Sequence, residues 1–359
     1  MAINKDLKFK PNYAVAPGLT VSEMLEHLGM SQVQLAERSG RPLKTINNII
    51  QGKQAITYET ALQFEKVLGM SADFWNNLEK NYGEALARIE DTKNLESELN
   101  WLKQLPVEDI ISNEWIRRMP TPVEQLQEVL SFFGVASPKE LAVGYPEVIF
   151  RQSKKLKSNP WAVCAWLRKG EIDAQAVSCS AYDRTKFKGA LSEIREMTTK
   201  NVPAIFEDWK KLCADSGVAL VIVQELPNLR VNGATKWLRD KAVLQLSLFQ
   251  KCVDILWFSF FHEAAHILLH GKKDMFIEYE KFKSDSDREQ EADFFAEDFL
   301  VPRSDYEVFI NKGAFNRSAI LRFAADMGIA PGIVLGRLQH DKKVAFNQLH
   351  DLKPRLCWK

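Results

Sequence analysis

This sequence of 359 residues lacks several features that would place it at once in a special class of protein. No apolar run approaches the roughly 20 residues that a membrane-spanning helix needs. The first fifteen residues, MAINKDLKFKPNYAV, carry lysines but no apolar core of a secretory signal. Internal repeats and low-complexity tracts are also missing. The sequence therefore predicts a cytoplasmic, globular protein with no membrane partner.

The sequence contains few cysteines, and its numbers of acidic and basic residues are nearly equal. The five cysteines are odd in number, widely scattered and never spaced as C-x-x-C, so they predict reduced thiols, neither a disulfide scaffold nor a cysteine zinc site. The net charge of +1 leaves nucleic-acid binding open, because a balanced total can hide a local patch. The cysteines are Cys164, Cys179, Cys213, Cys252 and Cys357.

The chain is too long for one compact core, and its hydrophobic pattern divides it. We expect an α+β fold that is mainly α: an N-terminal five-helix domain, a linker helix and a C-terminal domain with a small β-sheet. Helical spacing at 21–28, 31–39, 43–50, 57–68 and 72–80, punctuated by glycines, predicts the first domain. The predicted divisions are an arm at 1–17, the helical domain at 18–80, a helical linker at 81–122, a helical region at 123–200, a core at 201–310 and a helical tail at 311–359.

The core region alternates helix and strand signals. A helix is expected at 204–216, a buried strand at 217–227, and two further strands at 237–239 and 242–248 around the turn Arg239-Asp240-Lys241. An unusually apolar helix at 254–270 follows, then a charged loop at 271–287 and a second helix at 288–300.

A metal-binding pattern lies in the apolar helix. His262 and His266 are four residues apart, so their imidazoles project from one helical face and can bind one ion. Glu263 between them can orient a water molecule and take its proton. Two unpaired polar rings would be costly to bury in the run FSFFHEAAHILLH, which favours a metal partner. A catalytic zinc keeps three protein ligands and one open position.

The third ligand is expected from DREQEADFFAEDFLVP at 287–302, where Glu291, on a helical face with Phe294, Phe295 and Asp298, is preferred and Glu289 is the alternative. Glu289 has Asp293 four residues later on its own side of the helix. His270 lies too far along the helix to share an ion with His262, because a helix rises about 1.5 Å per residue. We interpret His270 as a histidine that supports the site from outside the ligand set.

A second pattern lies near the N-terminus. The spacing Gln32-x3-Ala36-x3-Gly40-x5-Ile46 predicts a helix-turn-helix, with a small residue at the helix crossing and glycine at the turn. The second helix, 43–50, would enter the major groove of operator DNA. Between 31 and 56, four basic residues oppose only one acidic residue, a local charge of +3. The candidate DNA contacts are Arg38, Arg41, Lys44, Thr45, Asn47, Asn48, Gln51 and Lys53.

Residues from about 123 to 340 resemble the ImmA/IrrE family of metallopeptidases. The resemblance rests on FFHEAAHILLHG at 260–271 and EQEADFFAEDFLVP at 289–302, with FRQSKK at 150–155 and WLRKGEIDA at 166–174 fitting the longer members. It implies Zn²⁺ held by His262, His266 and Glu291, with Glu263 as the catalytic base. Asp293 replaces the usual Asn, and Ala264-Ala265 replaces a Leu-Gly pair; neither change removes a ligand.

The first domain resembles Xre-family domains of the HigA-antitoxin type, through residues 28–57 and the run GKQAITYETALQFEKVLGMSADFWNNLEKNY at 52–82. Together the resemblances imply a DNA-binding transcriptional regulator whose zinc endopeptidase domain cleaves a regulatory protein such as a repressor. Two alternatives stay open. The chain could be a HigA-like antitoxin that binds operator DNA and a toxin, with a metal domain that does not cleave, or a regulator that cuts its own linker at 103–122. The resemblance of the N-terminal domain to Xre-family domains favours a homodimer.

Overall fold

The computed structural model describes residues 13–144, 159–248, 251–271, 275–279 and 287–356. Most of the arm expected at 1–17, the segment 150–155 and most of the loop expected at 271–287 lie outside these ranges. The chain divides into two compact units, Met1–Asn100 and Trp101–Lys359. The linker expected at 81–122 is therefore shared between them, and each unit is described by itself.

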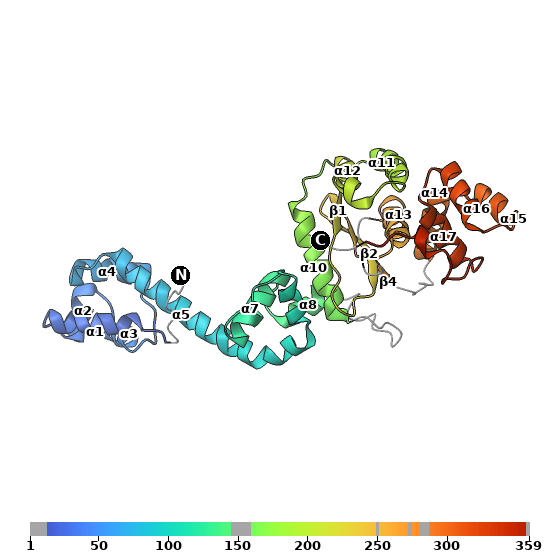
Figure 1. The fold of residues 1–359 in the computed structure, drawn as a ribbon. Helices are drawn as coiled ribbons and strands as arrows, with labels where there is room; N and C mark the ends of the chain where they lie inside the picture. The colour runs from blue at the N-terminus through green and yellow to red at the C-terminus, as the bar shows by residue number, and fades with distance from the viewer. Residues whose placement is uncertain (1–12, 145–158, 249–250, 272–274, 280–286, 357–359) are drawn as a thin grey trace, which may run out of the picture. The chain divides into compact units, whose positions relative to one another are not determined.

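The first unit is entirely helical among its described residues (Figure 1). Glycines with positive φ follow several of its helices, and Gly40 (φ 70°) ends the helix before the expected turn, as a C-terminal glycine should. The buried core contains Leu35, Ile46 and Trp75, which come from three different helices. The helices are α1 (Pro17–His27), α2 (Gln32–Ser39), α3 (Leu43–Ile50), α4 (Tyr58–Leu68) and α5 (Ala72–Glu98).

The last of these helices differs from the expectation. The pattern predicted a fifth helix ending at residue 80 and a separate connecting helix, whereas α5 continues without a break to Glu98. The only glycine or proline between residue 80 and Glu98 is Gly83. It lies inside α5 and does not end the helix. The short 3₁₀ helix η1 (Leu99–Gln104) then leads into the second unit.

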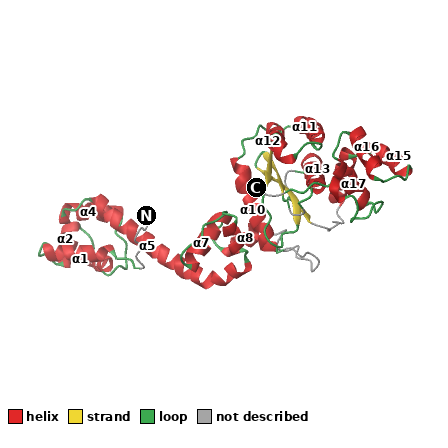
Figure 2. Cartoon of the chain, in the orientation of Figure 1, coloured by secondary structure: helices red, strands yellow, loops and turns green. Residues whose placement is uncertain are grey.

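The second unit combines helices with one small sheet (Figure 2). Before the sheet come α6 (Val107–Ser112), α7 (Pro122–Phe133), α8 (Pro138–Gly144), α10 (Pro160–Ala176), α11 (Arg184–Met197) and α12 (Val202–Asp215). The sheet strands are β1 (Val218–Ile222), β2 (Val231–Leu238), β3 (Lys241–Leu246) and β4 (Phe276–Tyr279). The later helices are α13 (Val253–Leu269), α14 (Asp287–Leu300), α15 (Arg303–Asn311), α16 (Arg317–Met327), α17 (Pro331–His340) and η2 (His350–Leu352).

The sheet has the strand order β1-β3-β2-β4. β1 pairs with β3 in parallel, whereas β2 pairs antiparallel with both β3 and β4. The expected hairpin is present: β2 and β3 are joined through Arg239 (φ 55°) and Asp240. β4 lies inside the segment expected to be a charged loop, and it forms the edge of the sheet beside α13.

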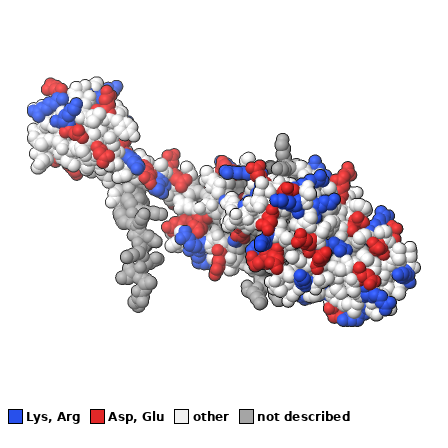
Figure 3. Space-filling model, turned by 90° about the horizontal axis from the view of Figure 1, so that it is seen from above, with Lys and Arg blue, Asp and Glu red and all other residues white. Residues whose placement is uncertain are grey.

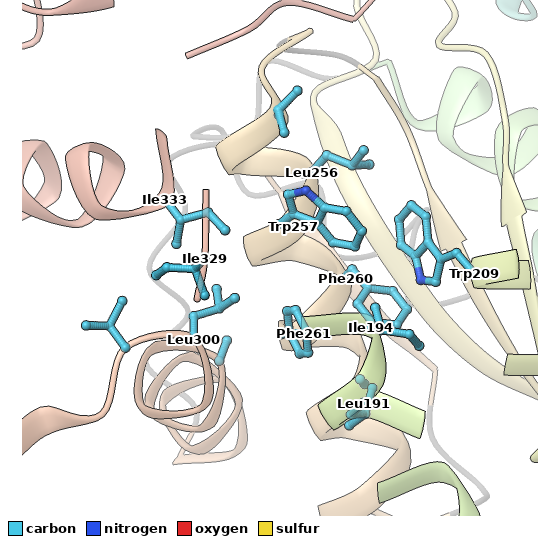
Figure 4. Packing of buried hydrophobic residues seen from close by; sticks show 14 of the residues in the cluster. Leu191, Ile194, Trp209, Leu256, Trp257, Phe260, Phe261, Leu300, Ile329 and Ile333 are labelled. Carbon is cyan, nitrogen blue, oxygen red and sulfur yellow. The ribbon is translucent and has the colours of Figure 1, made fainter. Parts of the chain in front are cut away.

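Alternate residues of a strand point to opposite faces of the sheet, and in β1 both sets are buried. Val218 and Leu220 of β1 join a cluster with α11, α12, α13 and α17, while Ala219 and Val221 join a second cluster with α7 and α10. Figure 4 shows α13 from close by, with its aromatic side chains between Trp209 on one side and aliphatic side chains of the C-terminal helices on the other. This packing fixes α13 against the sheet.

Among the described helices, none is by itself long and apolar enough to cross a membrane, although α16 and α17 meet the criteria of length and composition as a pair bent by 115°.

Candidate metal centre and helix-turn-helix head

Helix α13 buries the motif that the sequence singled out. His262 and His266 are each 2% exposed and Glu263 is fully buried. α13 packs against β2, β3 and β4 and against α14. Its buried polar groups therefore need partners, since a buried group without one costs about 1–3 kcal/mol.

Three donor atoms converge between α13 and α14. The Nε2 atoms of His262 and His266 are 3.1 Å apart, and a carboxylate oxygen of Glu289 lies 3.1 Å from the first and 3.5 Å from the second. A tetrahedral zinc with ligands at about 2.0–2.1 Å requires donor atoms about 3.3 Å apart. The observed triangle matches that spacing, so the residues present fit a zinc ion.

The far nitrogen of each histidine also has a partner. His262 Nδ1 lies 2.9 Å from Asp293 Oδ1, and His266 Nδ1 lies 2.8 Å from His270 Nδ1. His270 Nε2 in turn lies 3.1 Å from Glu291 Oε2. Partners of this kind orient metal-binding imidazoles and select their tautomer.

The structure brings Glu289 to the histidine pair, whereas Glu291, the residue preferred from the sequence, is occupied by His270. Glu289 and Asp293 are four residues apart and share a helical face, so both reach His262. Glu291 lies two residues along, where a helix turns by about 200°. Its carboxylate is consequently displaced from the triangle, and its side chain is 62% exposed.

Glu263 is held from the sheet. Thr235 of β2 donates its hydroxyl hydrogen to Glu263 Oε2, and Glu263 Oε1 is buried with no hydrogen-bond partner. Gly233 lies directly opposite, and a Cβ there would be 2.7 Å from Glu263 Cγ and 2.8 Å from Oε1. The missing side chain of Gly233 thus leaves room for the carboxylate.

Burial and proximity set the charges of the cluster. Burial raises the pKa of the Glu263 carboxyl well above its usual range, against the attraction of His262. Burial also raises the pKa of Glu278 on β4, which accepts a hydrogen bond from Asn232 Nδ2 at 3.4 Å. For Glu289, the contacts with His262 and His266 outweigh burial and lower the pKa to about 2.

The histidines themselves respond in opposite directions. Burial would lower the pKa of His262, but hydrogen bonds to Asp293 and Glu289 outweigh it and hold that pKa well above its usual value. Burial lowers the pKa of His266. Cation binding would compete with protonation of His262, because each Nε2 lone pair has to be free to coordinate.

Several residues of the site were not predicted from the sequence. Gly233, Thr235 and Glu278 come from β2 and β4, and Phe276 stacks on His266 with ring centroids 4.0 Å apart. No local pattern marks such residues, because they meet α13 through sheet pairing. The identity of Glu289 did have a signal, since Glu289 and Asp293 repeat the four-residue spacing of the two histidines.

The first unit, called the head below, contains the expected helix-turn-helix: α2 and α3 are joined by a turn that begins at Gly40. Ser31 caps α2 in a capping box with Gln34, with hydrogen bonds of 3.2 and 2.8 Å. Ala36 is 7% exposed at the crossing of α2 and α3, and Ile46 is fully buried. Of the candidate DNA contacts, Arg38, Lys44, Gln51 and Lys53 are exposed, and Arg41, Thr45, Asn47 and Asn48 are partly buried.

One candidate has an internal role. Arg41 donates to Glu59 at 2.8 Å and to Gln63 at 2.5 Å, so it ties the turn between α2 and α3 to α4. A guanidinium held in this way is less available to a phosphate than the exposed Lys44. On the face shown in Figure 3, basic and acidic side chains are interspersed over both units.

The fold and the site together define a class: an N-terminal helix-turn-helix module joined to an IrrE N-terminal-like domain. The helix-turn-helix family model matches residues 21–75, and the Peptidase_M78 model, described as an IrrE N-terminal-like domain, matches residues 256–338. Virulence-associated protein A of Dichelobacter nodosus is 37% identical over 75 residues, which are 20% of this chain and 72% of that protein. The chain belongs to the family of that protein.

Two solved structures are also similar to parts of the chain. An addiction module antidote protein of the HigA family from Coxiella burnetii is 34% identical, with a TM-score of 0.22, over 24% of this chain and 94% of its own. The Pseudomonas aeruginosa antitoxin HigA, solved with the higBA promoter, is 28% identical, with a TM-score of 0.23, over 24% of this chain and 95% of its own.

Proposed function

We propose that the protein is a DNA-binding transcriptional regulator whose second unit is a zinc-dependent endopeptidase acting on a regulatory protein. The enzymatic part of the proposal is supported by the donor atoms of His262, His266 and Glu289, which lie close together. Beside them is the buried Glu263, whose Oε1 has no hydrogen-bond partner. A purely structural zinc site would have four protein ligands and no need for an adjacent base.

The proposed ligands are His262, His266 and Glu289, with Asp293 orienting the first of them. When bound, Zn²⁺ supplies a Lewis acid that polarises a peptide carbonyl and lowers the pKa of water to about 7. Because the described residues supply three donors, a bound zinc ion would keep a coordination position for water or substrate.

Glu263 is the proposed base. Thr235 occupies Oε2, so Oε1 is the oxygen that accepts a proton from the attacking water and passes it to the leaving amide nitrogen. Burial raises the pKa of Glu263 well above its usual range, which makes the carboxylate a better proton acceptor. Gly233 keeps the carboxylate in place by leaving space for it.

In this proposal the head binds operator DNA and so brings the peptidase unit to a regulated promoter. α3 and its C-cap residue Gln51 present Lys44, Asn48 and Gln51, and none of the eight residues of α3 is acidic, which suits a helix that lies against phosphates in the major groove. Proteolysis attached to a DNA reader is then a regulatory event, and the proposed substrate is a regulatory protein such as a repressor.

The decisive experiment compares Glu263→Gln with the wild type. The amide has the size of the carboxylate but cannot take a proton, so we expect zinc content to stay near one ion per chain and cleavage to fall by at least 10²-fold. Zinc is measured by mass spectrometry of the intact protein, and cleavage by new peptide termini in cells expressing each form. Gln290→Glu, on the exposed side of α14, is the matched charge-changing control.

An equal set of new termini from both forms would contradict the assigned base. If the wild type binds zinc and produces no Glu263-dependent terminus, proteolysis is refuted and the alternative, an antitoxin-like repressor with a non-cleaving metal domain, is favoured. Binding to operator DNA and to a toxin partner would then be measured directly.

A further inference from the structure

The hydrogen bonds around His266 form a chain that runs away from the metal triangle. His266 Nε2 faces His262 and Glu289, while its Nδ1 lies 2.8 Å from His270 Nδ1. His270 Nε2 continues to Glu291 Oε2 at 3.1 Å. The His270 side chain is only 4% exposed, so these two contacts satisfy both nitrogens of a buried ring.

We propose that His270 and Glu291 are positioning residues that set the tautomer of His266 and thereby make it a metal ligand. This inference rests on the proposed zinc site. It gives His270 a role that is distinct from coordination, and it gives Glu291 a role although Glu289 occupies the ligand position.

The direction of the chain follows from the carboxylate at its end. Glu291 can only accept, so His270 Nε2 carries the hydrogen and His270 Nδ1 is left as an acceptor. That acceptor requires a hydrogen on His266 Nδ1. A neutral imidazole with hydrogen on Nδ1 has its lone pair on Nε2, the atom that faces the triangle.

The reverse direction would disable the site. If His270 Nδ1 carried the hydrogen, His266 Nδ1 would have to accept it and the hydrogen of His266 would move to Nε2. An N–H would then point at the position of the cation. Asp293 enforces the same tautomer on His262 in one step, at 2.9 Å, so α14 controls both histidines.

Phe276 holds the pair from the side. Its ring is stacked on His266, with centroids 4.0 Å apart and planes inclined by 14°, and lies 5.2 Å from the ring of His270. The stacked contact limits rotation of the His266 ring. The two imidazoles are consequently preorganised before any ion arrives.

The test uses two variants of similar size at position 270 in the full-length protein. His270→Asn can place its Oδ1 where the ring Nδ1 was and still accept from His266, whereas His270→Leu cannot. Zn²⁺ affinity is measured by competition with a chromophoric chelator, and Co²⁺ spectra report the ligand set. We expect His270→Leu to lose 10- to 100-fold in affinity, the usual effect of removing such a partner, and His270→Asn to stay within about threefold of the wild type.

Glu291→Ala is the third variant, because Glu291 is exposed and its removal leaves the core intact. We expect a smaller loss of about three- to tenfold, with a Co²⁺ spectrum of unchanged shape. His27→Leu, an exposed histidine in the head, is the control for an added leucine.

The outcomes separate the two proposals. Failure of the wild type to bind Zn²⁺ or Co²⁺ would overturn the proposed function itself. Wild-type binding with an unchanged affinity in His270→Leu would overturn only the positioning role. An equal loss in the Asn and Leu variants would show that position 270 contributes packing, and a Co²⁺ spectrum that loses a nitrogen ligand in both would make His270 a direct ligand; either result refutes the inference.

Discussion

The Gly233→Ala substitution tests the arrangement of the base most directly. The added methyl group would lie 2.7 Å from Glu263 Cγ and 2.8 Å from Oε1, well inside the roughly 3.5–4.0 Å at which heavy atoms pack best. Gly233 is paired with β3 and β4 on both sides, so its backbone cannot retreat. The Glu263 side chain must therefore move by about 1 Å.

Overpacking of this kind costs about 1–3 kcal/mol of unfolding free energy. At a urea dependence of about 2 kcal/mol/M, a cost of 2 kcal/mol lowers the urea midpoint by about 1 M. Displacement of a catalytic group by about 1 Å lowers the rate by about 10²-fold. Zinc affinity should change little, because Glu263 is outside the ligand triangle.

A double-mutant cycle with Glu263→Ala isolates the contact. Once the carboxylate is removed, the methyl group at 233 has no side chain to displace, and we expect most of the stability cost of Gly233→Ala to vanish. Urea unfolding of the full-length protein, followed by tryptophan fluorescence, provides the four free energies. Gly189→Ala is the control: its Cβ would contact nothing within 4 Å in helix α11, so we expect a gain of about 0.5–1 kcal/mol.

An equal cost of Gly233→Ala with and without the Glu263 carboxylate would refute the reasoning. Only a coupling energy above about 0.5 kcal/mol would indicate direct contact between the two positions.

Three further predictions follow from other parts of the chain. Glu289→Ala should lower Zn²⁺ affinity by at least 10²-fold and Glu291→Ala by no more than tenfold in chelator competition; the opposite order would restore the ligand inferred from the sequence. Lys44→Ala should weaken DNA binding and reduce the slope of log affinity against log salt by about 1, and an unchanged slope in gel-shift titrations would exclude a phosphate contact. Lys353→Met should cost about 3–5 kcal/mol in urea unfolding, because Lys353 lies 2.7 Å from buried Asp254 and its removal leaves that charge unpaired; a cost below 1 kcal/mol would contradict this.

The helices could be predicted well because their determinants are local. Both the spacing of apolar residues and the glycine that ends a helix can be recognised within a short stretch of sequence. Gly40 and Gly69 adopt the positive φ expected of helix ends. The exception is α5, where the polar composition after residue 80 indicated a separate linker although the chain simply continued as helix. β4 could not be predicted, because four residues at a sheet edge carry too short a pattern.

The site shows where local pattern stops being sufficient. His262, Glu263 and His266 share one helix, so the sequence alone determined their spacing and common face. The third ligand depends on how α14 rotates about its own axis against α13, and two glutamates two residues apart differ there by more than half a turn. Packing of the apolar face of α14 selected Glu289 for the triangle and left Glu291 to His270.

The sequence by itself determined the two modules, the helical elements of each and the chemistry that the His-Glu-x-x-His run can support. Only the tertiary structure decided which carboxylate completes the triangle, which residues of β2 hold and accommodate Glu263, and which histidine nitrogen faces the triangle. The physical reason is distance along the chain: helix periodicity acts over four residues, whereas Thr235 and Glu263, or His262 and Asp293, meet only after the sheet and two helices have packed.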